Sequence, residues 1–228
     1  YTESRHTSAE ECLLRTENVP LGPEPKAAVV EAAVTPKLLF DASVARHPRG
    51  KLQHWRAKTT RAIWGKGFPC RCAELVYTFV VKGHGADPLQ AEILLILRTC
   101  NRVLRRYPQL RARAEEVWQA RICNIVGNTT SKNPFHGPMG QLQHALEFLD
   151  WDMPSFGTIQ TPEGDQFDLW TCDAEHFLHC VRAGLRTAMW TAAAERRPEE
   201  FGGIDAPQGV DRACTCALLR KLEGKQRT

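Results

Sequence analysis

Two cysteines and two histidines follow one another at short spacing near the end of the chain, in a pattern that could bind zinc. If their segment is helical they share one face, and they are Cys172, His176, His179 and Cys180. Four ligands on one straight helix cannot surround an ion tetrahedrally, so a complete site needs ligands from Cys70 and Cys72 or from Cys214 and Cys216. The competing interpretation is that the thiols pack as small apolar residues and the histidines lie at the edge of the core. We treat the four as candidates only and expect no metal site.

Metal-dependent phosphoryl transfer commonly uses paired aspartates, and the sequence contains no adjacent pair. The nearest approach is Asp150 and Asp152, which we expect to end a helix before Pro154. No cysteine lies in a nucleophile motif, and no glycine-rich phosphate loop is present. The sequence therefore predicts no catalytic residue and no cofactor for this stretch of chain.

The most one-sided charge lies between residues 46 and 72, which hold eight Lys or Arg and no acid. Apolar residues recur there at intervals of three and four from Leu52 to Ile63, which predicts a helix with one buried face that ends at Gly65 and Gly67. Lys51, Arg56, Lys58 and Arg61 are expected to point away from this face. The candidate nucleic-acid-binding residues of this segment are these four together with Lys66 and Arg71. A face that only aids solubility usually mixes both signs of charge, whereas a single sign beside aromatic residues suits a nucleic-acid backbone.

A second basic stripe lies on the clearest amphipathic helix of the sequence. Asp87 and Pro88 form a strong start signal, with the aspartate as N-cap and the proline at the first helical position, and the periodicity continues to Tyr107. The arginines of this helix recur at i, i+4, i+7 and i+8, and they are Arg98, Arg102, Arg105 and Arg106. If the two stripes line a common groove, they grip a nucleic-acid strand together.

Most of the remaining elements are predicted to be helices. Two consecutive helical pieces are expected over residues 27–45, with Thr35 capping the second, and further helices over 108–127, 139–150, 174–196 and 211–222. On the basic helix, Trp64 is expected in the core, and the position of Trp55 is left open between core and binding surface.

One small β-hairpin completes the predicted fold, with residues 156–160 and 166–170 on either side of a turn-rich spacer. Residues 73–81 fit a strand or a short buried helix equally well. The sequence thus predicts a mainly α fold. It also predicts a flexible linker over residues 1–26, one globular unit over 27–222 and a tail over 223–228.

Composition narrows the class of protein. The longest apolar runs, such as residues 93–97, are far shorter than the roughly 20 residues that cross a bilayer, so no membrane span is expected. The net charge is only +4, so attraction to nucleic acid has to come from local clusters. Nine cysteines are an odd number and too sparse for a disulfide scaffold. With neither an initiator Met nor a secretory signal at the start, we expect a piece of a longer intracellular protein, nuclear or cytoplasmic, with reduced thiols.

Several motifs recur in the order found in one family of polymerases. The first is Val34-Thr35-Pro36-Lys37-Leu38-Leu39-Phe40-Asp41, followed by Leu52, Trp55 and then Arg61-Ala62-Ile63-Trp64-Gly65. This order resembles the segment after the palm in reverse transcriptases of non-LTR (LINE-type) retrotransposons, with Phe40 and Asp41 in the place of a Tyr-Gly pair.

The downstream motifs resemble those of dinoflagellate-type retroelement proteins. They are Arg71-Cys72-Ala73-Glu74-Leu75, then Gly83-His84-Gly85-Ala86-Asp87-Pro88, then Gly137-Pro138-Met139-Gly140 with Leu142, Ala145 and Leu146, and finally Gly209-Val210-Asp211-Arg212. Together with the first set they cover about residues 27–222.

The resemblance implies a thumb-like helical bundle and a downstream linker from an RNA-directed DNA polymerase. Its partners would be RNA, DNA or a hybrid, and the upstream palm domain of the same polypeptide. Magnesium would belong to the active site of the parent polymerase, because the metal-binding aspartates of the family are absent here. The expected function is a non-catalytic grip on template and primer. The alternatives are a helical protein-interaction module whose basic faces meet acidic partners and, third, a zinc or thiol enzyme.

Overall fold

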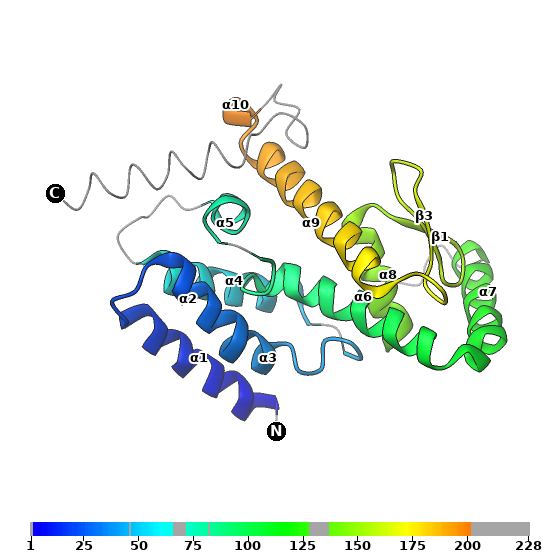
Figure 1. Cartoon of the computed structure of the whole chain (residues 1–228), viewed down its shortest axis with the longest axis horizontal. Helices are drawn as coiled ribbons and strands as arrows, with labels where there is room; N and C mark the ends of the chain where they lie inside the picture. The colour runs from blue at the N-terminus through cyan, green and yellow to red at the C-terminus, as the bar shows by residue number, and fades with distance from the viewer. Residues whose placement is uncertain (1, 46, 66–71, 82, 128–136, 202–228) are drawn as a thin grey trace. The chain divides into compact units, whose positions relative to one another are not determined.

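Helices make up most of the chain, together with a small antiparallel sheet, and the predicted mainly α fold class is confirmed (Figure 1). The computed structural model describes residues 2–45, 47–65, 72–81, 83–127 and 137–201. The first elements in chain order are α1 (Thr2–Asn18), α2 (Pro23–Val29), the π-helical turn η1 (Val30–Val34), α3 (Thr35–Leu38), α4 (Arg49–Trp64), α5 (Ala73–Leu75) and a second π-helical turn, η2 (Val76–Val80). They are followed by α6 (Pro88–Arg106), the 3-10 turn η3 (Pro108–Leu110), α7 (Arg111–Gly127), α8 (Pro138–Leu149), β1 (Asp152–Ser155), β2 (Thr158–Gln160), β3 (Gln166–Asp168), α9 (Ala174–Arg196) and α10 (Pro198–Phe201).

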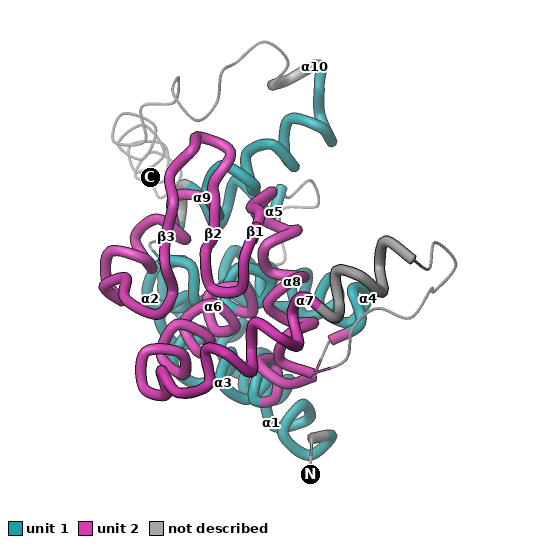
Figure 2. The backbone as a smooth tube through the Cα atoms, turned by 90° about the vertical axis from the view of Figure 1, so that its right-hand side faces the viewer, with its two compact units in different colours: residues 1–40, 48–91, 185–228 teal, residues 41–47, 92–184 magenta. Residues whose placement is uncertain are grey.

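The described residues fall into two compact units (Figure 2). The first unit takes its described residues from 2–40, 48–91 and 185–201, and the second from 41–47 and 92–184. The division falls within α6 and within α9, so each of these helices contributes residues to both units.

The first unit begins with two helices where a flexible linker was predicted, and that prediction is wrong for the described part of residues 1–26. Ala9, Leu13 and Thr16 recur at helical spacing on α1 and are buried, and α1 packs against α4. Pro23 and Pro25 lie in the first turn of α2, where a proline costs no hydrogen bond.

The interior of the first unit is built around α4, as its apolar spacing predicts. Trp55 is only 1% exposed, whereas Trp64 at the end of the helix is half-buried. The hydroxyl group of Tyr77 lies 2.8 Å from that of Thr59, which joins α4 to η2. Residues 73–80, for which strand and helix were left open, are helical.

Aspartates begin α6 and α9 as predicted. Asp87 Oδ1 accepts a hydrogen bond from the backbone N–H of Leu89 at 3.1 Å, and Asp173 Oδ2 accepts one from the N–H of His176 at 3.0 Å. The hydrogen bond from His176 is the main cause of the lowered pKa of Asp173. The cap predicted at Thr35 is wrong, because its hydroxyl donates to the carbonyl oxygen of Gly85 at 2.8 Å instead.

The sheet of the second unit contains the predicted hairpin and one additional strand. β2 pairs with β3 in antiparallel register, with Ile159 opposite Phe167, and β1 pairs with the other edge of β2. Strand β1 was missed because Pro154 lies within it; such a proline is tolerated at an edge strand. Ile159 and Phe167 are both buried, and the ring of Phe167 lies 6.0 Å between centroids from that of Phe177 on α9, so one face of the sheet packs in the interior of the second unit.

The turn between β1 and β2 requires glycine at position 157. Gly157 has a φ of +88°, and a Cβ atom there would overlap the indole ring of Trp170. We expect Gly157→Ala to lower the free energy of unfolding by about 2 to 3 kcal/mol, through backbone strain and displacement of the indole. Urea denaturation measures this change. Gly164→Ala is the matched control, because Gly164 has a φ of +94° with open space around it. An equal loss in both variants would contradict the role of Trp170.

Candidate nucleic-acid interface

The basic side chains of α4 are largely paired with residues of α1. Lys58 Nζ lies 2.9 Å from Glu10 Oε1, and Arg61 Nε donates to Glu17 Oε1 at 2.9 Å. Lys51 Nζ lies 3.0 Å from Nδ1 of His6. These contacts mix acid and base on one exposed surface, so α4 does not present the single-sign face that its own sequence predicts.

Arg56 of α4 is a correction to the predicted interface, because its side chain lies in the core. It is 2% exposed, its NH1 donates to Glu74 Oε1 at 2.7 Å, and its Nε donates to both carboxylate oxygens of Asp87 at 3.1 and 3.0 Å. Burial alone would lower the pKa of Arg56, but the two carboxylates outweigh it and the pKa is raised. Arg56 therefore holds the fold together and contacts no solvent-exposed ligand.

The same ion cluster explains why several motif residues are present. Glu74 comes from the Arg-Cys-Ala-Glu-Leu motif and Asp87 from the Gly-His-Gly-Ala-Asp-Pro motif, and both bind Arg56. Gly85 of the second motif leaves room for the side chain of Glu31, which would overlap any Cβ at that position. These motif residues have a structural function in the first unit. The remaining α4-region candidates, Lys66 and Arg71, lie outside the described residues.

The second basic stripe is exposed as predicted. The side chains of Arg98, Arg102, Arg105 and Arg106 are all exposed on α6, and they fall within an arc of about 100° on the helix. From the first to the last they span about 12 Å, at about 1.5 Å per residue. Arg105 helps lower the pKa of Asp173 at long range, yet within the described part of the chain no carboxylate oxygen lies within 4.0 Å of the four guanidinium groups.

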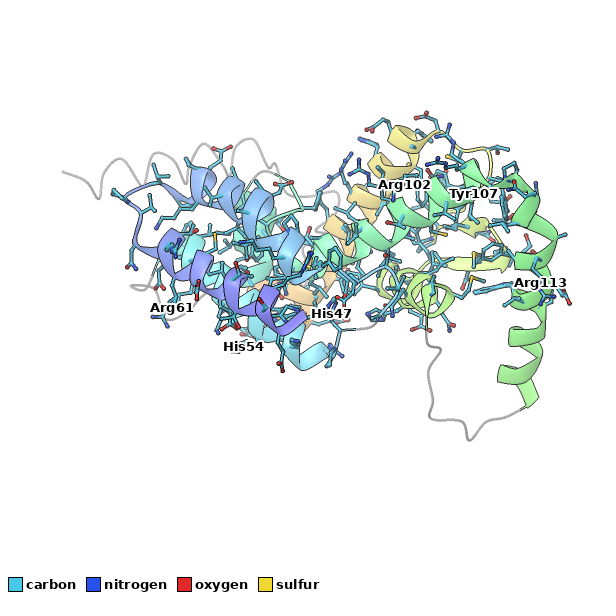
Figure 3. The ribbon with its side chains drawn as sticks, turned by 90° about the horizontal axis from the view of Figure 1, so that it is seen from below. His47, His54, Arg61, Arg102, Tyr107 and Arg113 are labelled. Atoms are coloured by element: carbon cyan, nitrogen blue, oxygen red, sulfur yellow. The ribbon has the colours of Figure 1, made fainter. Side chains whose placement is uncertain are left out.

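The surface beyond the end of α6 adds residues that were not predicted. Tyr107 is 40% exposed and lies directly after the arginine stripe, and Arg113 lies in the first turn of α7 (Figure 3). Arg111 is the first residue of α7. Arg113 NH1 donates to Glu116 at 2.7 Å, but Arg111 reaches only 4.0 Å from Asp168. The four arginines at positions 105, 106, 111 and 113 are the signal in the sequence that could have indicated this surface.

Two apolar residues of the predicted helix over 108–127 are exposed. Leu110 and Val117 recur at helical spacing, which predicts a shared buried face, yet both are 44% exposed. Leu110 lies in the 3-10 turn η3, directly before α7, so it does not continue the helical period of α7.

The four zinc candidates are not grouped into a metal site in the part of the chain that the structure describes. Cys172 precedes α9, Cys180 lies on it, and His176 and His179 are exposed on the same helix. The pKa of Cys172 is raised, first by desolvation and then by the charge of Cys180, which disfavours the thiolate that binds zinc. Among the residues described, no three His, Cys, Asp or Glu side chains are grouped to hold an ion. Of the other proposed ligands, Cys72 is described and belongs to no such group, whereas Cys70, Cys214 and Cys216 lie outside the described residues.

Asp150 and Asp152 lie where α8 ends and β1 begins. Asp150 is the C-cap of α8 with a left-handed φ of 58°, and Asp152 begins β1. They are thus placed at the junction between a helix and a strand, as their position before Pro154 suggests.

A buried histidine with two carboxylates was not anticipated. His47 Nδ1 lies 2.8 Å from Glu92 Oε1, and its Nε2 lies 3.1 Å from Asp41 Oδ1. Glu92 is 1% exposed, so the imidazole screens a carboxylate that would otherwise be costly to bury. The sequence gives no local indication of this cluster, because its members are up to 51 positions apart.

Among the described helices, none is both long enough and apolar enough to span a bilayer.

Comparisons with known proteins identify no relatives. A scan against protein-family models, a search of curated proteins and a search of solved structures each returned no match for this chain.

Proposed function

We propose that this chain binds nucleic acid through the arginine stripe of α6. The observation that carries the proposal is the set of four exposed arginines on one face of α6, none of which has a carboxylate oxygen within 4.0 Å among the described residues. Guanidinium groups bind phosphate through paired hydrogen bonds, and a helix holds them at fixed spacing. A span of about 12 Å matches three to four phosphates along one strand, which rise about 3.4 Å each in a duplex.

The α4 stripe has a smaller part in this proposal than its sequence suggested. Lys58 and Arg61 already have carboxylate partners on α1, and Arg56 is buried. Binding a phosphate at α4 would require these ion pairs to break. The α6 stripe requires no such exchange among the described residues.

We also propose, from the order of the sequence motifs, that the chain is the region after the palm in a LINE-type reverse transcriptase. A helical portion with a basic face and no paired aspartates is compatible with a grip on template and primer. The coding sequence upstream of Tyr1 tests this assignment. It predicts an Ala-Asp-Asp motif there, in a palm that would bind magnesium, and a readable upstream sequence without that motif would reject it.

The binding proposal predicts a strong dependence on salt. If α6 neutralises three to four phosphates, affinity for a DNA duplex should fall about 40- to 150-fold between roughly 50 and 200 mM salt, because each phosphate adds about 0.9 to the logarithmic slope. Arg102→Ala combined with Arg105→Ala should lower the slope by about one to two units. Fluorescence anisotropy of a labelled duplex at several salt concentrations measures both.

The matched control is Lys58→Ala combined with Arg61→Ala, which removes the same charge from α4. These residues are paired with Glu10 and Glu17, so the slope should stay unchanged. If only the α4 variant changes the slope, α6 is a solvated face. If the chain binds no oligonucleotide at all, the protein-interaction module with acidic partners becomes the better interpretation.

A further inference from the structure

We infer that the surface after α6 binds an unpaired base, so that the preferred ligand is a single-stranded nucleic acid. This inference rests on the proposed function, because the α6 arginines would hold the phosphates of the same strand. It adds a site that α6 alone does not supply, made of one aromatic platform and one adjoining hollow.

The platform is Tyr107. Its side chain is 40% exposed, and the guanidinium group of Arg106 lies 5.7 Å from the ring centroid. The backbone is held on both sides, since the N–H of Tyr107 donates to the carbonyl of Val103 at 3.0 Å and its own carbonyl accepts from the N–H of Leu110 at 3.0 Å. An exposed aromatic ring on a fixed backbone, beside an arginine, is the arrangement on which bases stack.

The hollow begins at the next residue along the chain. It is open to solvent, has a volume of about 620 Å³, and is lined by Pro108, Gln109, Arg111, Ala112, Glu115, Ser155 and Phe156. Its two walls are joined because Glu115 Oε2 accepts a hydrogen bond from the backbone N–H of Phe156 at 2.8 Å. Sites for small organic ligands commonly measure about 300 to 1,000 Å³, so a base with its sugar fits within this volume.

The lining suits the edge of a base better than a second phosphate. Gln109 supplies an amide and Ser155 a hydroxyl, which can donate to or accept from the polar atoms of a base. The carboxylate of Glu115 would repel a phosphate that entered deeply. Arg111 stands at the rim, 61% exposed, where it can contact the backbone of the same strand.

The base has to be unpaired. In a duplex the base faces are stacked against their neighbours, so neither Tyr107 nor the hollow could reach one without first extruding it. A protein with only a basic helix face would favour the duplex, whose charge density is higher. The aromatic platform therefore predicts a preference that the arginines alone would not produce.

The experiment compares three labelled probes at one salt concentration, using the whole chain: a twelve-nucleotide oligothymidine strand, the same length of strand with abasic sugars, and a twelve-base-pair duplex. Binding of oligothymidine should exceed binding of the abasic strand by about 5- to 150-fold, the range expected for one stacked base. Tyr107→Ala should remove this difference, whereas Tyr107→Phe should retain it. Leu110→Ala, at a neighbouring residue that is 44% exposed, is the control and should change nothing.

The outcomes separate this inference from the proposed function. Equal binding of oligothymidine and the abasic strand, with both lost in the Arg102→Ala, Arg105→Ala variant, would overturn the base site and leave the basic face standing. Binding of no probe would overturn both. The abasic comparison uses the unaltered chain, so it decides the question even if Tyr107→Ala fails to fold.

Discussion

Replacing Arg56 by methionine should lower the free energy of unfolding by about 3 to 5 kcal/mol, because it leaves the buried carboxylate of Asp87 without its cation and that of Glu74 with only the more exposed Arg196. Glu74 and Asp87 are 2% and 0% exposed, and each is within 3.0 Å of the Arg56 guanidinium group. Methionine matches much of the volume of the arginine side chain, so the loss reports on charge more than on packing. Urea denaturation followed by circular dichroism measures it.

Arg196→Met is the matched control for this change. Arg196 NH1 also binds Glu74 Oε1, at 2.8 Å, but its side chain is 55% exposed. Its loss should cost at most about 1 kcal/mol, as for a surface ion pair. A triple variant with Arg56→Met, Glu74→Gln and Asp87→Asn should recover part of the stability, since no buried charge then remains unpaired and Asn still caps α6. Failure of the triple variant to recover any stability would show that Arg56 acts through packing.

The ion cluster also makes stability depend on pH in a defined direction. Burial raises the pKa of Glu74, but the charge of Arg56, the hydrogen bonds to the carboxylate and the charge of Arg196 together outweigh it, so the pKa of Glu74 in the folded chain is below its ordinary value. A carboxyl group with a depressed pKa stabilises the fold above the pKa of the unfolded chain, and this contribution is lost as the pH falls through the folded value. Stability should therefore decline in acid, and Arg56→Met should show a smaller decline.

The local sequence was sufficient to predict those features that depend on the residues of a single helix. The N-cap at Asp87, the exposed arginine face of α6 and the buried residues of α8 all follow from spacing within a single element. The hairpin follows in the same way from its turn residues. These features could be predicted because each depends on contacts within about one helix or one turn.

The ion pairs of the basic residues on α4 could not be predicted, because their acidic partners are far away in sequence. Glu10 and Glu17 lie on α1, which was taken for a linker, and they reach Lys58 and Arg61 across 48 and 44 positions. Periodicity places Arg56 beside the buried Trp55 and Thr59, but it cannot show that two buried carboxylates bind the Arg56 side chain. Whether an arginine binds a ligand or a buried acid is decided by tertiary packing, which local patterns do not contain.

Substitution of the two tryptophans of α4 tests most clearly which face of this helix is buried. Trp55 is 1% exposed, with the ring of His6 at 4.8 Å between centroids and the ammonium group of Lys51 5.0 Å from the indole. Trp64 is half-buried, next to Gly65, which ends the helix. We expect Trp55→Ala to lower the free energy of unfolding by about 3 to 5 kcal/mol, as for a large core truncation, and Trp64→Ala by only about 1 to 2 kcal/mol.

The two substitutions delete the same atoms from the same helix, so their difference isolates burial from helix propensity. Circular dichroism should be used to follow urea denaturation, because each variant removes a tryptophan that would report by fluorescence. Trp55→Phe should retain part of the stability that Trp55→Ala loses, since the ring still fills most of the cavity. If Trp64→Ala proved the more damaging change, the face that α4 buries would be rotated toward Trp64. The contacts of α1 with Lys58 and Arg61 would then no longer explain why that stripe is unavailable to a ligand.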